Sequence, residues 1–324
     1  MRRDIVEEYR TIEAGAGWID RAARGRIRFE GRDAASFLQA LLTNDVLRVQ
    51  RGEGVYAAYL TPQGRMITDI DVLHRGGWLF GSVPDGLGAS MAARFDQLIF
   101  SEDLTVSDVS SLWTEIAVAG GDASVRVARA LAEDAARLAA LPELSQIDYG
   151  DGFVVRGGDA PWPMFRIVVP VAERGAIVSA LEQHGVVPMS AEVAETLRVE
   201  AGRPLWGREL TADTIPLEAG LLERAISTSK GCYVGQEIII RILHRGGGRV
   251  AKRLMTVMFG ATVQEPPAPG TSLLADGHAV GHVTSAVYSP ARDAIVALAY
   301  VHRDAAAVGR VLTIDGGGTG AIVA

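Results

Sequence analysis

The sequence is poor in cysteine and has no long apolar run. Cys232 is the only cysteine in 324 residues, which excludes a disulfide within the chain and a metal site built from its cysteines alone. No uncharged apolar stretch approaches the ~18 residues of a transmembrane helix, and the start of the chain has no apolar segment typical of a secretory signal. We therefore expect a cytoplasmic protein that does not enter a membrane.

An excess of basic residues is also missing. The net charge is −7, which argues against binding nucleic acid through its phosphates. The six histidines form no HExxH pattern, so we expect no metal site. The composition, 48% hydrophobic and 22% charged, is that of an ordinary globular protein. A chain of this length is expected to fold into two or three packed units.

The order of predicted elements indicates an α+β fold. Strand patterns and helix patterns alternate in the first 245 residues, without a Rossmann fingerprint or a P-loop. Strands are predicted at 27–31, 55–60, 66–73 and 165–171, and helices at 87–99, 124–139, 173–183 and 190–201. After Gly246, Gly247 and Gly248 the pattern changes to short β-type runs separated by turns. Five or six such runs without a helix predict a small barrel or sandwich.

The lone cysteine lies in a glycine-bracketed turn that runs from Lys230 to Glu237. A helix starting near Val234 would place the thiol at a helix N-terminus, where the dipole and Lys230 favour thiolate. Three consecutive isoleucines keep a strand as a competing assignment. The alternative for Cys232 itself is an inert side chain buried in the core, where cysteine is often found.

Three carboxylates stand out by their position. Glu200 falls on the apolar face of its predicted helix, seven residues after Val193. It is either turned into solvent by fraying or held inward for an N–H-rich ligand such as a pterin. Asp69 and Asp71 alternate along a predicted strand and share one face. That face is either solvated or lines a cavity in which the pair positions a nitrogen.

Together these segments resemble the YgfZ family, folate-binding proteins related to the glycine cleavage T-protein, GcvT. The turn from Lys230 to Glu237 is similar to the hallmark cysteine motif of YgfZ. The segments 197–205, 215–221 and 37–46 resemble the core that GcvT and YgfZ share, and 281–290 is similar to the C-terminal barrel. The resemblance implies a three-lobed ring around a tetrahydrofolate channel. It divides the chain into two interleaved α+β lobes at 1–245, the second at roughly 50–115, and a β-barrel at 246–324.

The resemblance also implies roles for individual residues. Glu200 would hold the pterin ring, with Asp69, Lys230 and Tyr233 as further folate contacts and Cys232 as the functional thiol. GcvT has two adjacent acids where this chain has Thr68 and Asp69, and it has no cysteine in the turn. Both departures favour YgfZ.

Our leading hypothesis is therefore a monomeric, tetrahydrofolate-binding accessory protein for iron–sulfur cluster assembly or repair, with radical-SAM-type client proteins as partners. The alternative is a tetrahydrofolate-dependent aminomethyltransferase.

Overall fold

The computed structural model describes residues 2–314 and 317–324. Its contacts divide the chain into two compact units. The first contains Met1–Tyr59, Asp69–Ala194 and Ala225–Tyr233, and the second contains Leu60–Thr68, Glu195–Arg224 and Val234–Ala324. Both units are therefore assembled from separate stretches of the chain. The predicted boundaries at residues 50, 115 and 245 stay a prediction.

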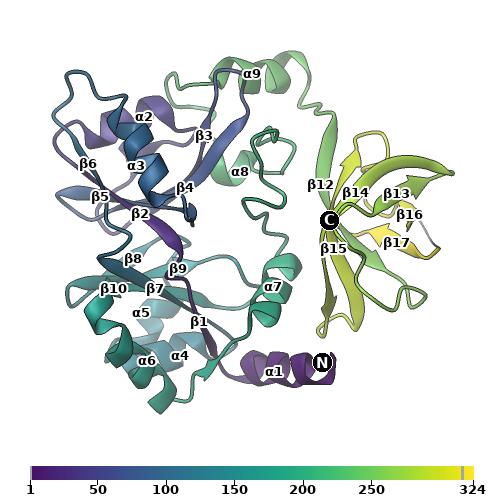
Figure 1. Ribbon diagram of the computed structural model, residues 1–324, viewed down its shortest axis with the longest axis horizontal. Coiled ribbons are helices and arrows are strands. Elements are labelled where there is room, and N and C mark those ends of the chain that lie inside the picture. The colour runs from purple at the N-terminus through teal and green to yellow at the C-terminus, as the bar shows by residue number, and fades with distance from the viewer. Residues whose placement is uncertain (1, 315–316) are drawn as a thin grey trace. The chain divides into compact units, whose positions relative to one another are not determined.

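The first unit is built on two sheets (Figure 1). A six-stranded sheet has the order β11 (Val187–Pro188), β1 (Gly17–Asp20), β7 (Trp113–Ala119), β10 (Met164–Pro170), β9 (Gly152–Gly157), β8 (Gln146–Tyr149). A five-stranded sheet has the order β3 (Gly54–Leu60), β4 (Met66–His74), β5 (Trp78–Asp85), β2 (Arg24–Glu30), β6 (Thr105–Asp108). The turn between β3 and β4 is assigned to the second unit. Strand β1 pairs with β11 in parallel. The antiparallel pairs are β1 with β7, β7 with β10, β10 with β9, β9 with β8, β2 with β5, β2 with β6 and β4 with β5.

The first unit also contains helices and short helical turns. They are α1 (Arg2–Ala14), α2 (Ala34–Leu41), η1 (Val46–Arg48), α3 (Gly88–Asp96), α4 (Ala123–Leu131), α5 (Ala135–Ala139), η2 (Val171–Glu173) and α6 (Arg174–Gln183). Helices α4, α5 and α6 pack on the six-stranded sheet through one buried apolar cluster that includes Val127, Leu138 and Leu181. Between the two sheets, the rings of Phe80 and Phe153 meet edge to face with centroids 5.2 Å apart.

The helix predicted at 124–139 is in fact two helices. Ala132 adopts a left-handed conformation with φ of 54° and ends α4. Asp134 then caps α5, because its carboxylate accepts hydrogen bonds from the amides of Ala136 and Arg137. The composition of the stretch favours helix throughout, so the break was not visible in its periodicity.

The second unit contains the barrel and the segments that lead to it. Its helices are α7 (Ala191–Glu200), whose first turn belongs to the first unit, α8 (Leu222–Ala225), α9 (Gln236–Ile240) and the π-helical turn η3 (Arg241–Arg245). The closed barrel has the order β12 (Lys252–Phe259), β15 (Ala294–His302), β14 (His278–Ser289), β13 (Ser272–Ala275), β16 (Val311–Ile314), β17 (Thr319–Ile322). The predicted α+β class and the C-terminal barrel are confirmed.

Gly235 is the second glycine of the cysteine turn. Its backbone conformation and the lack of room for a side chain both require glycine. Its φ is 83°, which L-residues rarely adopt. A Cβ there would lie 2.5 Å from the carbonyl oxygen of Thr61 and 3.3 Å from the Cα of Gly64. Gly64 in turn faces Ile238, the second residue after Gln236 in α9. The turn at residues 61–65 and the start of α9 therefore pack backbone against backbone within the second unit.

Candidate functional site

Lys230 is anchored to the main chain of a neighbouring turn. Its Nζ donates to the carbonyl oxygens of Gln39 and Leu42, both at 2.6 Å, and of Asn44 at 2.8 Å. A lysine ammonium has three N–H donors, so these three acceptors use its full capacity. Burial lowers the pKa of Lys230 to about 8, against the opposing effect of Asp45. This geometry favours a positioning role for Lys230 over the direct folate contact that we predicted.

The turn at residues 42–45 also holds the segment that precedes Lys230. The Thr43 hydroxyl donates to the carbonyl oxygen of Ala225 at 2.6 Å and accepts from the amide of Ala58 at 2.8 Å. The carbonyl oxygen of Thr43 accepts from the amide of Ser227 at 3.0 Å. Because Thr43 is completely buried, these bonds are shielded from water. Residues 225–230 are thus fixed to strand β3 through the turn.

Cys232 is exposed, whereas Tyr233 beside it is buried. The Lys230 ammonium lies 5.2 Å from the centroid of the Tyr233 ring. Burial raises the pKa of the Tyr233 hydroxyl to about 12. The alternative interpretation of Cys232 as an inert side chain buried in the core is therefore wrong. Lys230 and Tyr233 on either side of Gly231 and Cys232 hold the thiol at the surface.

The predicted position of the thiol at a helix N-terminus needs correction. A helix does follow the cysteine, but α9 begins at Gln236 and its N-cap is Gly235. Cys232 lies three residues before that cap and outside the first turn, where the effect of the dipole is concentrated. Gly235 in the left-handed region delays the helix, because a residue in that conformation cannot continue an α-helix backward.

Asp69 and Asp71 share one face of β4, as predicted, but that face is not simply solvated. Asp71 is buried and its Oδ2 lies 2.6 Å from Nη1 of Arg166 on β10. Asp69 is partly buried and its Oδ2 accepts a hydrogen bond from the Tyr56 hydroxyl at 3.0 Å. The sequence did not predict the contacts of Tyr56 and Arg166 with these aspartates, because each residue lies on another strand.

The environment of Asp69 shifts its titration. Burial raises the pKa of its carboxyl above the ordinary aspartate value. The positive charge of Arg24 and the Tyr56 hydroxyl oppose this shift, while the negative charge of Asp71 adds to it. A carboxyl with a raised pKa and a fixed hydrogen bond suits proton transfer.

Glu200 is the last residue of α7 and lies in the second unit. The helix starts as predicted, because the Ser190 hydroxyl accepts from the amide of Val193 at 3.2 Å. The Glu200 carboxylate is partly buried and its Oε1 accepts from the Ser289 hydroxyl at 2.5 Å. Ser289 is the last residue of β14. The carboxylate is therefore held against the barrel and is not frayed into solvent.

A second contact fixes α7 to the same barrel strand. Arg198 is buried and its guanidinium reaches Oε2 of Glu209 at 3.0 Å and the Ser285 hydroxyl at 2.8 Å. Ser285 also donates to Oε1 of Glu209 at 2.6 Å. Ser285 and Ser289 are four residues apart on β14 and share a face. The helix end that carries Glu200 is thus held at two points.

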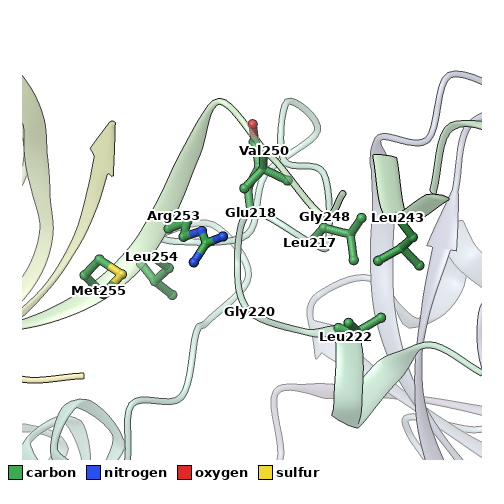
Figure 2. A pocket seen from close by; sticks show the side chains of 10 residues that line it. All are labelled: Leu217, Glu218, Gly220, Leu222, Leu243, Gly248, Val250, Arg253, Leu254 and Met255. Atoms are coloured by element: carbon green, nitrogen blue, oxygen red, sulfur yellow. The ribbon is translucent and has the colours of Figure 1, made fainter. Parts of the chain in front are cut away.

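The second unit also contains a cavity of about 230 Å³ (Figure 2). Its lining is mostly apolar, with one carboxylate and one guanidinium, and consists of Leu217, Glu218, Gly220, Leu222, Leu243, Gly248, Val250, Arg253, Leu254 and Met255. Burial raises the pKa of Glu218, against the effects of Lys252 and Arg65. The cavity is small compared with the ~300–1,000 Å³ of typical ligand pockets.

Within residues 2–314 and 317–324, no group of three or more His, Cys, Asp or Glu side chains is arranged to hold a metal ion. None of the helices there is long and apolar enough to cross a bilayer.

The chain matches known proteins over almost its full length. Residues 1–156 match the GCVT N-terminal domain and residues 252–323 the glycine cleavage T-protein C-terminal barrel domain. An aminomethyltransferase of Rubrobacter xylanophilus is 30% identical over 92% of this chain and 79% of its own. One of Nostoc is 29% identical over 96% of this chain and 83% of its own.

A solved structure shows the same fold. The crystal structure of the glycine cleavage system aminomethyltransferase T from Bartonella henselae superposes with a TM-score of 0.88 at 21% identity, and the match covers 98% of this chain and 88% of the other.

These relatives contradict our leading interpretation. They are named aminomethyltransferase, and nothing in their names supports iron–sulfur cluster assembly or iron–sulfur client proteins. The cysteine turn and Thr68 are two local departures from GcvT, and the similarity of the whole chain outweighs them. With the two domains of the glycine cleavage T-protein and a 30% identical aminomethyltransferase as a relative, the chain belongs to the aminomethyltransferase family.

Proposed function

We propose that this protein is a tetrahydrofolate-dependent aminomethyltransferase, which moves a one-carbon unit from an aminomethyl-lipoyl carrier protein to the folate. The main support is the similarity to proteins of that name over more than nine-tenths of the chain. The expected cofactor, tetrahydrofolate, is the one that this family uses. The iron–sulfur role has no such support.

The carboxylates of the chain fit the folate chemically. A carboxylate offers two acceptor oxygens to adjacent N–H groups, as on a pterin ring. Glu200 is partly buried and its Oε1 accepts from the Ser289 hydroxyl, so its carboxylate is fixed in position at the end of α7. We therefore assign Glu200 to the pterin and Asp69 to proton transfer.

Bound tetrahydrofolate supplies two N–H groups that take up the methylene carbon, and their protons leave with ammonia and with the carrier thiol. Asp69, as the ionised carboxylate, accepts a proton from a nitrogen and returns it to the leaving group. The Tyr56 hydroxyl keeps the carboxylate oriented while this happens. This exchange balances without a thiol from the protein, so Cys232 stays a predicted functional residue without an assigned step.

The deciding experiment is formation of methylene-tetrahydrofolate from tetrahydrofolate and an aminomethyl-lipoyl carrier protein. The purified wild type should release ammonia and the methylene product in equal amounts. Cys232→Ser should keep this activity, and its loss there would give the thiol a step. Absence of product with the wild type, measured with a carrier that a known aminomethyltransferase accepts, would contradict the proposal.

Glu200→Gln should weaken tetrahydrofolate binding roughly 10- to 100-fold, because a hydrogen bond to a charged acceptor contributes about 1.5–3 kcal/mol. Binding is measured by calorimetry under reducing conditions. Glu192→Gln, at an exposed position in the first turn of the same helix, is the matched control and should bind like wild type. Equal affinities in all three proteins would remove Glu200 from the site.

The finer placement of the chain beside YgfZ depends on the cysteine turn and on Thr68. It stays a prediction.

A further inference from the structure

We propose that Lys230 is a positioning residue for Asp69, and that it acts through the turn at residues 42–45 and through Tyr56. This inference deepens the proposed function, since it names what holds the proton-transfer carboxyl in place. It concerns residues of the first unit only.

The first link is the ammonium of Lys230. It draws three carbonyl groups from the end of α2 and the following turn to within 2.8 Å or less. Carbonyl dipoles that converge in this way repel one another unless a cation lies between them. A compact point charge on a flexible stem suits three converging acceptors, whereas the planar guanidinium of arginine does not. The turn therefore depends on a lysine.

The second link runs from the turn to the aspartate. Asn44, whose carbonyl oxygen accepts from Lys230, donates through its side-chain Nδ2 to the carbonyl oxygen of Tyr56 at 2.9 Å. Tyr56 then donates its hydroxyl to Asp69 at 3.0 Å. Thr43 adds a parallel attachment to β3 through the amide of Ala58. Three consecutive hydrogen-bonded contacts thus join the cysteine turn to the carboxyl.

The ionisation of Asp69 is a sensitive readout of this chain of contacts. The groups that act on the carboxyl include Arg24 from β2, Asp71 on β4 and Tyr56 from β3. Of these, only Tyr56 is linked to Lys230 by the contacts described. Its hydroxyl lowers the pKa of Asp69, so a displaced Tyr56 should allow that pKa to rise.

The test is a carboxyl ¹³C NMR titration of ligand-free protein labelled at aspartate Cγ, with Asp69→Asn to assign the signal. Tyr56→Phe should raise the pKa of Asp69, and Lys230→Met should raise it in the same direction. The double variant Tyr56→Phe, Lys230→Met should show no further rise, because both changes remove the same hydrogen bond. Lys230→Arg should behave like Lys230→Met.

Two further variants provide an alternative to Lys230→Met and a control. Asn44→Ala leaves the lysine contacts to main-chain carbonyls in place and should still raise the pKa, which keeps the test available if Lys230→Met does not fold. Lys252→Met is the control. It removes another lysine ammonium that lies over an aromatic ring, 4.3 Å from the centroid of Tyr300, and it should leave the pKa of Asp69 unchanged. Lys230→Met and Asn44→Ala titrations identical to wild type, with Tyr56→Phe shifted, would overturn the proposal.

The titration needs no substrate, so it separates this inference from the proposed function. An absent transfer activity with the expected NMR shifts would reject the aminomethyltransferase and keep the positioning role. Normal transfer activity of the wild type, together with an unchanged pKa of Asp69 in Lys230→Met, would keep the aminomethyltransferase and reject the positioning role.

Discussion

Replacing Asp69 with asparagine is expected to slow aminomethyl transfer by roughly 100- to 10,000-fold, the usual contribution of a positioned acid–base group. Asparagine keeps the size of the side chain and can still accept from Tyr56, but it cannot take up a proton. The loss should appear in kcat at saturating tetrahydrofolate. Asp71→Asn is a poor control, because Asp71 is paired with Arg166. Asp85→Asn, at an exposed strand end of the same sheet, is a better one.

The pH dependence gives a second reading of the same residue. As a base, Asp69 must be ionised, so the rate should fall as pH drops through its pKa. Because burial raises that pKa, the fall should begin at a higher pH than an exposed aspartate, with its pKa of ~3.9, would produce. Tyr56→Phe should move the acid limb to still higher pH, because it removes a hydrogen bond to the charged form. An acid limb that is unchanged in Tyr56→Phe would contradict the assignment.

Stability should respond in the opposite direction from activity. A carboxyl whose pKa is raised in the folded state contributes stability below its unfolded pKa and loses it as pH rises through the folded value. At pH 7, above the unfolded pKa of an aspartate, the raised pKa of Asp69 therefore costs stability. Asp69→Asn should unfold at an equal or higher urea concentration than wild type at that pH. A large drop in stability would show instead that the activity loss comes from misfolding.

The sequence indicates most of the backbone elements but little of the electrostatics. Alternation identified β4 and placed Asp69 and Asp71 on one face, and short β-type runs after Gly248 predicted the barrel. Both patterns are local, since strand faces repeat every two residues. Arg166 lies 95 positions from Asp71, and no periodicity relates such residues. The ion pair is therefore visible only after the two sheets are packed.

Lys230 shows a different limit of sequence reasoning. Its place beside Cys232 suggested an effect on the thiol, because neighbours in sequence are easily read as neighbours in space. The ammonium instead turns to the main chain at Gln39, Leu42 and Asn44. Carbonyl acceptors are present at every residue, so the choice of these three leaves no trace in residue type.

The largest expected effect on stability concerns Arg166. Its guanidinium and the carboxylate of Asp71 have side-chain exposures of only 5% and 9%. Burial alone would lower the pKa of Arg166, but Asp71 and Glu115 outweigh it and raise that pKa. Arg166→Leu would leave both carboxylates without this cation in a buried setting. We expect a loss of about 3–5 kcal/mol in the free energy of unfolding, measured with urea.

The chain offers a matched control for this loss. Arg32 and Asp103 have the same 2.6 Å separation, but their side chains are 86% and 54% exposed. Solvent screens such a pair, so Arg32→Leu should leave the free energy of unfolding close to that of the wild type. A similar loss in Arg32→Leu and Arg166→Leu would show that burial does not decide the strength of the effect.

The double variant Arg166→Leu, Asp71→Leu completes the cycle. Removing both charges eliminates the unpaired buried carboxylate, and replacing a buried ion pair by apolar side chains is often close to neutral. The double variant should therefore recover much of the stability lost in Arg166→Leu, with Glu115 limiting the recovery because Arg166 also lowers its pKa. A double variant as unstable as the sum of the two single changes would mean that the pair has no coupling.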